Sequence, residues 1–240
     1  MTEIIQYTND YLFMISDYGS PDRHKHLTAH LVCALSGSLR CFIGTDTVEC
    51  DGILLYPDIE HDIQATGRML VFLFANTSKI TDLMVEKYLS DKDYAIIPEA
   101  ALGRIKAEYL RGTEHLDERI LKDLSLYTTE RAQFDDRVAE AIEELESAET
   151  VSGDMIARLS RQVCLSQSRL SHLFKKDIGI SLNRYLSFMK MKKAYEYVRK
   201  GETLTSAAFH AGFDSSSHMA AACKRMFGIS LSAFMKSQER

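Results

Sequence analysis

The spacing of apolar residues divides the chain near residue 77. Up to that point, short apolar or alternating runs such as 31–35, 39–43 and 69–74 are separated by turn residues such as Ser36-Gly37-Ser38. This punctuation is typical of short antiparallel strands. Residues 1–77 are therefore expected to form an antiparallel β-barrel of the jelly-roll kind.

From residue 78 the apolar residues recur at helical spacing. Residues 78–133 predict three helices with apolar stripes, one of which carries Leu116, Ile120 and Leu124. The stripes could cover the barrel, or they could pack on a second copy of the chain. We expect a helical linker or dimerisation region here, and a homodimer, because symmetric dimers are the commonest oligomers.

The remaining segment, residues 134–240, contains one helical motif twice. Residues 174–182 (FKKDIGISL) recur as residues 223–231 (CKRMFGISL), at an offset of 49. Each copy predicts a short helix, a turn and a second helix with a polar face, which is the pattern of a helix-turn-helix. Two copies predict an all-α domain that contacts two successive grooves of double-stranded DNA.

The second helix of each motif carries a polar stripe. In the first motif Ser166 is a natural N-cap, and Leu170 and Phe174 face inward. The residues expected to contact DNA are Ser168, Arg169, Ser171, His172 and Lys175 in the first motif and Ser216, Ser217, His218 and Lys224 in the second. Ala220 and Ala221 lie on the second stripe. Alanine can touch a thymine methyl group but makes no hydrogen bond, so the first helix is expected to carry most of the base recognition.

A basic helix over residues 182–200 connects the two motifs. It is expected to hold the two recognition helices about 34 Å apart, one helical turn of DNA. Thr203 is placed as the N-cap of the first helix of the second motif, and Ser215 begins its second helix. Gly212 is placed in its turn, where a positive φ costs glycine little.

The charge distribution supports a nucleic-acid partner. The chain has a net charge of −5, but residues 1–157 hold 14 Lys and Arg against 29 Asp and Glu, a net of −15, while residues 158–240 hold 15 against 5, a net of +10. The basic segment can neutralise phosphates and release counterions. The low overall pI therefore does not exclude DNA binding.

Composition excludes other classes. No apolar run approaches 18 residues, so no transmembrane helix is expected, and the N-terminus lacks the basic start and apolar core of a signal peptide. The five cysteines include no C-x-x-C pair, which favours a reduced, cytoplasmic setting.

Residues 134–240 resemble the DNA-binding domain of the AraC/XylS family of bacterial transcription regulators. The resemblance is carried by Leu165-Ser166-x-Ser168-x-Leu170-Ser171-x-Leu173-Phe174-Lys175-Lys176-x-x-Gly179, by Ala208-x-x-x-Gly212-Phe213, and by Lys224 with Gly228-x-Ser230. It implies a transcription regulator that contacts DNA through Ser168, Ser171, His172, Ser216, Ser217 and His218, with RNA polymerase as a further partner. This chain has Cys164 where the family often has glycine. Met219, Ala221 and Cys223 stand where the family usually has Phe, Arg and Phe, which predicts weaker specificity in the second motif.

Four histidines cluster in the N-terminal sequence. His24, His26 and His30, followed by Gly37, and His61, preceded by Gly52 and Pro57, resemble the two cupin motifs, with His30 in the place of a glutamate. Alternating His24 and His26 point to one strand face, and with the other two they could form a three- or four-imidazole site for a transition metal. The alternative is that the four line an apolar ligand pocket without metal.

Three functions are compatible with these features. The first is a regulator, not an enzyme, that responds to a small molecule or a metal in the barrel. The second is a metal-dependent cupin enzyme with a helical appendage; Tyr56 and Glu60 near His61 form no recognisable catalytic arrangement for it. The third is a DNA-binding architectural protein without an effector. Two matched helix-turn-helix motifs in a basic segment favour the first.

Overall fold

The computed structural model describes residues 2–17, 22–90, 92–228 and 230–232. Its contacts divide the chain into two units, Met1–Ala132 and Gln133–Lys236, which are described separately below as the N-terminal unit and the C-terminal unit.

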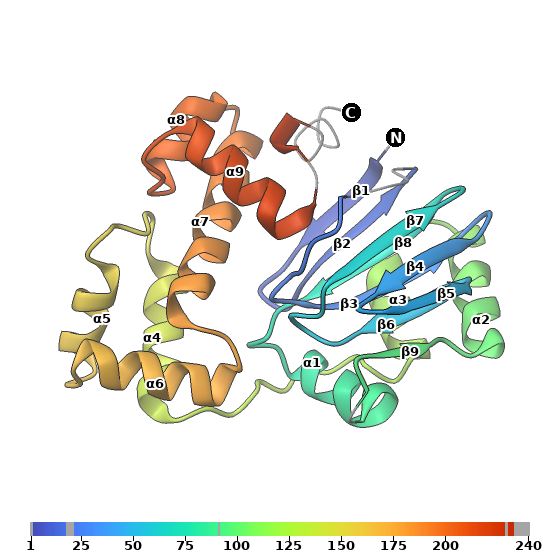
Figure 1. Ribbon diagram of the computed structural model, residues 1–240, viewed down its shortest axis with the longest axis horizontal. Helices are drawn as coiled ribbons and strands as arrows, with labels where there is room; N and C mark the ends of the chain where they lie inside the picture. Colours follow the sequence, from blue (N-terminus) through green and yellow to red (C-terminus); the bar gives the residue numbers. More distant parts are fainter. Residues whose placement is uncertain (1, 18–21, 91, 229, 233–240) are drawn as a thin grey trace. The chain divides into compact units, whose positions relative to one another are not determined.

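The N-terminal unit contains two antiparallel sheets (Figure 1). The strands are β1 (Thr2–Tyr7), β2 (Tyr11–Ser16), β3 (Ala29–Ala34), β4 (Leu39–Ile43), β5 (Asp46–Cys50), β6 (Gly52–Leu55), β7 (His61–Ala65), β8 (Met69–Phe74) and β9 (Tyr94–Ile96). The larger sheet has the order β1-β2-β8-β3-β6-β9 and the smaller one the order β5-β4-β7.

The antiparallel fold expected for this region is confirmed, but the closed barrel is not. Among the described residues the strands form two sheets, because the chain crosses from one sheet to the other in turns between β3 and β4, β5 and β6, β6 and β7, and β7 and β8. Each strand in the described part of the chain belongs to a single sheet. The architecture is a jelly-roll-like pair of layers, which places the side chains of facing strands opposite one another.

Side chains of the central strand β3 alternate between two buried faces. Ala29, Leu31 and Cys33 belong to an apolar core that the helices of this unit complete. His30 and Val32 therefore lie on the opposite face. His30 is 3% exposed there, and its ring lies 4.9 Å from the ring of His61, the first residue of β7 in the smaller sheet. The face of β3 that carries His30 therefore packs against the smaller sheet.

The helices that follow β8 cover one face of the larger sheet (Figure 1). They are α1 (Lys79–Met84), the π-helical η1 (Val85–Leu89), α2 (Glu99–Leu110) and α3 (Leu116–Asp123). Their apolar stripes, including Met84, Ile105 and Ile120, are fully buried in the same core as β2, β3 and β8. Core cover thus accounts for these stripes but not for Leu110 at the end of α2, which is 83% exposed, and the homodimer stays a prediction.

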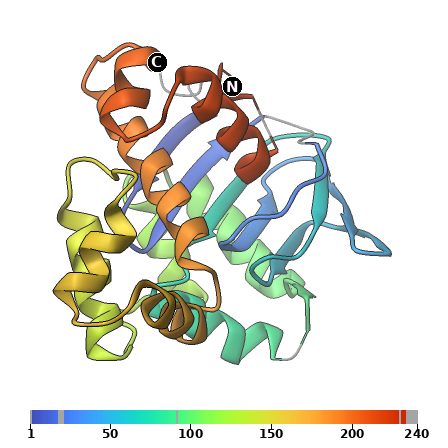
Figure 2. The same ribbon diagram turned by 60° about the vertical axis from the view of Figure 1, so that its left-hand side comes forward.

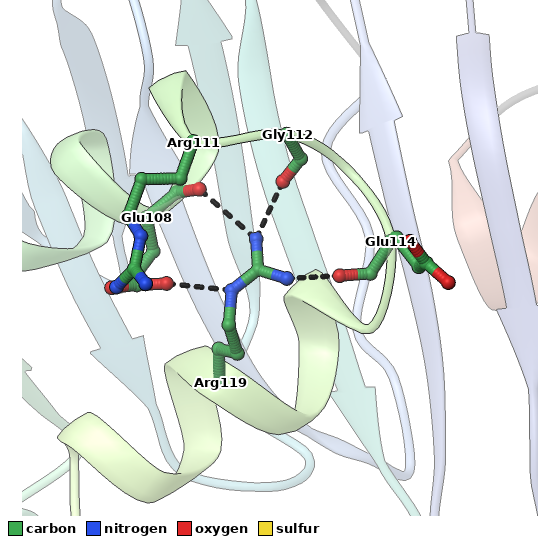
Figure 3. A network of polar contacts seen from close by, with 5 residues as sticks. All are labelled: Glu108, Arg111, Gly112, Glu114 and Arg119. Carbon is green, nitrogen blue, oxygen red and sulfur yellow. Dashed lines mark hydrogen bonds and ion pairs between the residues drawn. The ribbon is translucent and has the colours of Figure 1, made fainter.

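Arg119 fixes the connection between α2 and α3 (Figure 3). Its Nε donates to Oε2 of Glu108 at 2.6 Å, and its guanidinium also donates to the backbone carbonyls of Glu108, Gly112 and Glu114. Arg111 donates to the other oxygen of Glu108 at 2.6 Å. A planar guanidinium presents several donors at once, which is why a single arginine can hold the whole connection.

The C-terminal unit is helical. Its helices are α4 (Asp136–Ser147), α5 (Met155–Gln162), α6 (Gln167–Ile178), α7 (Leu182–Arg199), α8 (Leu204–His210) and α9 (Ser216–Phe227). Figure 2 shows α7 running between two helix pairs, α5 with α6 and α8 with α9. The two expected helix-turn-helix motifs and their connecting helix are confirmed. Within the part of the chain that the structure describes, no helix is both long and apolar enough to cross a membrane.

Candidate DNA-binding surface and histidine cluster

The turn of the first helix-turn-helix motif is closed by a backbone hydrogen bond. The amide of Leu165 donates to the carbonyl of Ser160 at 2.9 Å, and Cys164 between α5 and α6 has a φ of +54°. In the Schellman ending of a helix, a residue with a left-handed backbone is followed by one whose amide donates to the carbonyl five residues earlier. Cys164 therefore occupies a position that glycine fills at lower cost.

The second motif has the same closure. The amide of Phe213 donates to the carbonyl of Ala208 at 2.9 Å, and Gly212, as expected from the sequence, has a positive φ of +92°. A Cβ atom on Gly212 would lie 2.0 Å from the carbonyl oxygen of Val151. The turn of the second motif thus packs directly against the backbone of the loop between α4 and α5.

The first recognition helix, α6, separates buried from exposed residues. The Ser166 hydroxyl caps it by accepting from the amide of Arg169 at 3.2 Å, and Leu170 and Phe174 are fully buried. The exposed face carries Ser168, Arg169, His172 and Lys175, with Ser171 partly buried beside them. Gly179 ends the helix with a φ of +81°. The five predicted contact residues therefore lie together on one accessible side.

The second recognition helix, α9, repeats this arrangement. The Ser215 hydroxyl accepts from the amide of His218 at 3.0 Å, and Met219 and Cys223 are fully buried. Ser217, His218 and Lys224 are exposed, and Ser216 is partly buried. Gly228 ends the helix with a φ of +67°. Ile229, which follows it in the repeated sequence, lies outside the described residues.

One polar contact on α9 was not predicted. Nδ1 of His218 lies 3.0 Å from Oδ2 of Asp214, and the imidazole also packs edge-on against Phe213, with ring centroids 5.5 Å apart. Asp214 immediately precedes the N-cap Ser215, so its carboxylate lies beside the first turn of α9, where His218 is. The carboxylate orients a residue expected to contact DNA.

The four histidines of the N-terminal unit form one buried cluster. The ring centroids lie 4.3 Å apart for His24 and His26, 4.7 Å for His24 and His61, and 4.3 Å for His26 and His30. Each of the four residues is at most 9% exposed. Ligand nitrogens of His24, His26 and His61 all lie within 4.8 Å of one another. The cluster expected from the sequence is therefore assembled.

Backbone carbonyls orient two of these rings. Nδ1 of His24 lies 2.5 Å from the carbonyl oxygen of Asp22, and Nδ1 of His61 lies 2.8 Å from that of Ile59. A carbonyl only accepts, so each Nδ1 carries the proton and each Nε2 presents its lone pair. Nε2 of His24 faces Nε2 of His26. A carbonyl that accepts from one ring nitrogen and leaves the other free to bind is the usual way in which metal-binding imidazoles are oriented.

Burial keeps the cluster uncharged at neutral pH. It lowers the pKa of His61 to about 4, lowers that of His24, and holds the pKa values of His26 and His30 well below the usual range. Repulsion among the four rings adds to the effect on His26, His30 and His61. Neutral imidazoles are the form that binds metal, so the residues present fit a transition metal that prefers nitrogen.

The two candidate residues for the enzyme hypothesis lie apart from this arrangement. Glu60 pairs with Arg23, with Nε and Oε2 3.4 Å apart, and its side chain is 60% exposed. Tyr56 is 43% exposed. Both side chains therefore face solvent rather than the buried rings.

The C-terminal unit is similar in sequence to known helix-turn-helix proteins. Residues 159–237 match a family model described as a helix-turn-helix domain. The arabinose operon regulatory protein of Escherichia coli (strain K12) is 27% identical over 165 residues, which are 68% of this chain and 56% of that protein. This chain spans little more than half the length of that relative.

Solved structures with this fold cover both units. An apo variant of ToxT from Vibrio cholerae strain SCE256 has a TM-score of 0.60 at 13% identity and covers 97% of this chain and 99% of its own. Wild-type ToxT from the same strain, with an unsaturated fatty acid bound, has a TM-score of 0.61 at 12% identity and covers 96% of each chain. This chain therefore shares its two-part fold with ToxT.

Proposed function

We propose that the chain is a sequence-specific DNA-binding transcription regulator that is controlled by an effector in its N-terminal unit. The observation that carries the proposal is the pair of recognition helices, each capped by serine, buried on its apolar side and exposed on its polar side. The segment that contains them has a net charge of +10. Its binding to DNA is therefore expected to weaken as salt concentration rises.

The two recognition helices would contribute differently. Ser168, Ser171 and His172 present hydroxyls and an imidazole that can hydrogen-bond to base edges, and Arg169 and Lys175 can reach phosphates. On α9, Ser216, Ser217 and His218 are the proposed base contacts, with Lys224 as a further DNA contact. The exposed Ala221 adds no hydrogen bond there. We therefore assign most of the sequence preference to α6.

The effector would be a transition metal or a small molecule bound in the N-terminal unit. The buried histidine cluster supports the metal, and the fatty acid bound to ToxT, a protein of the same fold, supports an organic ligand. An effector changes DNA affinity only through its different affinities for the DNA-binding and non-binding states. We also propose that the chain acts in the cytoplasm as a homodimer and contacts RNA polymerase.

Alanine variants at two positions of α6 test the assignment. The duplexes are a fragment identified by genomic footprinting and a scrambled duplex of the same composition. His172→Ala is expected to lose on the order of 1–3 kcal/mol on the footprinted fragment and little on the scrambled one, because a base contact is lost. Lys175→Ala is expected to weaken both alike and to lower the salt dependence. Equal losses for His172→Ala on both duplexes would contradict its role in recognising bases.

A metal-dependent enzyme remains the second candidate, favoured by the histidine cluster alone. It predicts a chain that binds metal and shows no preference between the footprinted and scrambled duplexes. Preference for the footprinted fragment at physiological salt decides in favour of the regulator.

A further inference from the structure

The turn of the second motif contains one residue that the turn of the first motif lacks. In the first motif Leu165, whose amide closes the turn, directly precedes the N-cap Ser166. In the second motif Phe213 closes the turn in the same way, but Asp214 stands between it and the N-cap Ser215. The second motif therefore carries an additional acidic side chain at the start of its recognition helix.

The position of this carboxylate is unfavourable for DNA binding by itself. Asp214 is one of only five Asp and Glu residues in residues 158–240, a segment with a net charge of +10. Its side chain is 90% exposed beside the first turn of α9, the helix proposed to lie in a groove of DNA. A negative charge there repels the phosphates of the duplex. The carboxylate therefore weakens DNA binding unless it serves a neighbouring residue.

The neighbour that it contacts is His218, whose ring is held from two sides. Nδ1 of His218 lies 3.0 Å from Oδ2 of Asp214. The ring also packs at 83° to that of Phe213, which is itself fixed in the core at 3% exposure. The amide of His218 donates to the hydroxyl of Ser215 at 3.0 Å, which fixes the backbone of the same residue. The imidazole therefore has a defined orientation at the start of α9.

The contact with the carboxylate also fixes which nitrogen of the ring carries the proton. A carboxylate oxygen only accepts hydrogen bonds, so Nδ1 of His218 carries the proton. In the neutral ring Nε2 then has a lone pair and no proton. The side chain is 44% exposed, and among the described residues the structure shows no hydrogen bond to Nε2. His218 thus presents an acceptor to the molecule that α9 contacts.

We infer that Asp214 is a positioning residue that fixes this tautomer of His218, and that His218 thereby accepts from the exocyclic amino group of an adenine or a cytosine. This inference rests on the proposed function, because it specifies the base chemistry of a contact assigned there. The amino groups at N6 of adenine and N4 of cytosine are the donors that bases present in the major groove, whereas guanine and thymine present acceptors. A ring protonated on Nε2 would donate and would favour guanine or thymine instead.

Long-range proton–nitrogen NMR of the full chain tests the tautomer in the absence of DNA. The measurement is made at pH 8, above the range in which histidine takes up a second proton. The signal of His218 is identified by its loss in His218→Gln. The wild-type ring is expected to be protonated on Nδ1, and Asp214→Ala is expected to convert at least part of it to the form protonated on Nε2. A wild-type ring protonated on Nε2 would overturn the inference.

Asp154→Ala is the matched control for the loss of a charge. Asp154 is an exposed carboxylate at the N-cap position of α5, in the same unit, and its side chain accepts from Ser152. Its replacement removes a negative charge near the start of a helix, as Asp214→Ala does, but it leaves the environment of His218 intact. The His218 signals should therefore be unchanged in this variant.

Binding to a set of duplexes tests the base preference. Each base pair of the footprinted fragment that the second motif covers is replaced in turn by the other three, and the position at which His218→Ala relaxes the preference identifies the contacted base. The wild type is expected to prefer adenine or cytosine there over guanine or thymine by a factor of about 2–10, the net contribution of one hydrogen bond. Asp214→Ala is expected to abolish or reverse this ratio. The ratio is the measure, because loss of a negative charge raises the affinity for every duplex.

An unchanged ratio in Asp214→Ala would contradict the inference, since Asp214 would then have no part in the choice of base. The inference also fails if no position responds to His218→Ala. Failure of the regulator proposal is a different result, namely equal affinity of the wild type for the footprinted and the scrambled duplex. The NMR measurement does not depend on that outcome.

Discussion

Replacing Gly212 by alanine is expected to destabilise the C-terminal unit strongly. Its φ of +92° is in the left-handed region, which costs a residue with a Cβ atom roughly 1–2 kcal/mol. The new Cβ would also lie 2.0 Å from the carbonyl oxygen and 2.8 Å from the carbonyl carbon of Val151. These are backbone atoms, so relief requires moving a loop, at a further cost of about 1–3 kcal/mol.

Urea unfolding followed by circular dichroism measures this loss. A total of about 2–5 kcal/mol is a large part of the stability of a domain of this size. Binding to the footprinted duplex should fall with it, because Gly212 lies immediately before Phe213, which anchors the turn in the core at 3% exposure. A variant as stable as the wild type would show that this turn does not pack on Val151.

The first motif supplies the matched control. Cys164 occupies the corresponding turn with a φ of +54°, and its side chain is exposed. Cys164→Gly removes the cost of a left-handed residue and few contacts, so the C-terminal unit is expected to gain about 1 kcal/mol. If Gly212→Ala destabilises the unit and Cys164→Gly stabilises it, the left-handed backbone conformation of these turns, and not the size of the side chain, determines their stability.

The metal-free protein is expected to lose stability as the pH falls from 6.5 towards 4. Above pH 6.5 the clustered histidines are neutral in both the folded and the unfolded chain. Below it the unfolded chain binds protons first, because burial lowers the pKa of His61 to about 4 in the folded state. The free energy of unfolding therefore falls with pH, and the loss is complete below the folded pKa. For His61 alone it is on the order of 3 kcal/mol.

Urea titrations at pH 7.5, 6.5 and 4.5, with a chelator present, test this dependence. Most carboxylates still carry their charge in this window, since their unfolded pKa values lie near 4. The double variant His26→Gln, His61→Gln lacks two of the side chains that must stay neutral in the folded state. Its free energy of unfolding should therefore change less with pH. Stability that is unchanged between pH 7.5 and 4.5 in the wild type would contradict the burial of uncharged imidazoles.

The helical half of the molecule follows closely from its sequence. The caps at Ser166 and Thr203, the long helix between the motifs and the positive φ of Gly212 all lie where the sequence places them. These features are local, since a cap or a turn is decided by residues within four positions of one another. The contact of Gly212 with Val151 is not local, and sequence gave no indication of it.

The N-terminal half was less predictable because its features depend on distant pairings. Resemblance to a known motif grouped the four histidines, but the sequence did not predict that His30 lies in the larger sheet while His61 lies in the smaller one with His24 bridged to it. Strand alternation alone also could not decide between a closed barrel and two sheets. That choice depends on where the chain crosses between layers, which is set by turns such as the one after Leu55.

Chemical footprinting of the bound duplex tests the central claim most directly. Hydroxyl-radical cleavage of the footprinted fragment is expected to show protection of backbone on one face of the duplex, flanking two successive major grooves about 34 Å apart. Gly212→Ala, which destabilises the C-terminal unit as a whole, should weaken both protected regions. Protection over a single groove by the wild-type protein, or none above that of a scrambled duplex, would contradict a chain that binds DNA through both recognition helices.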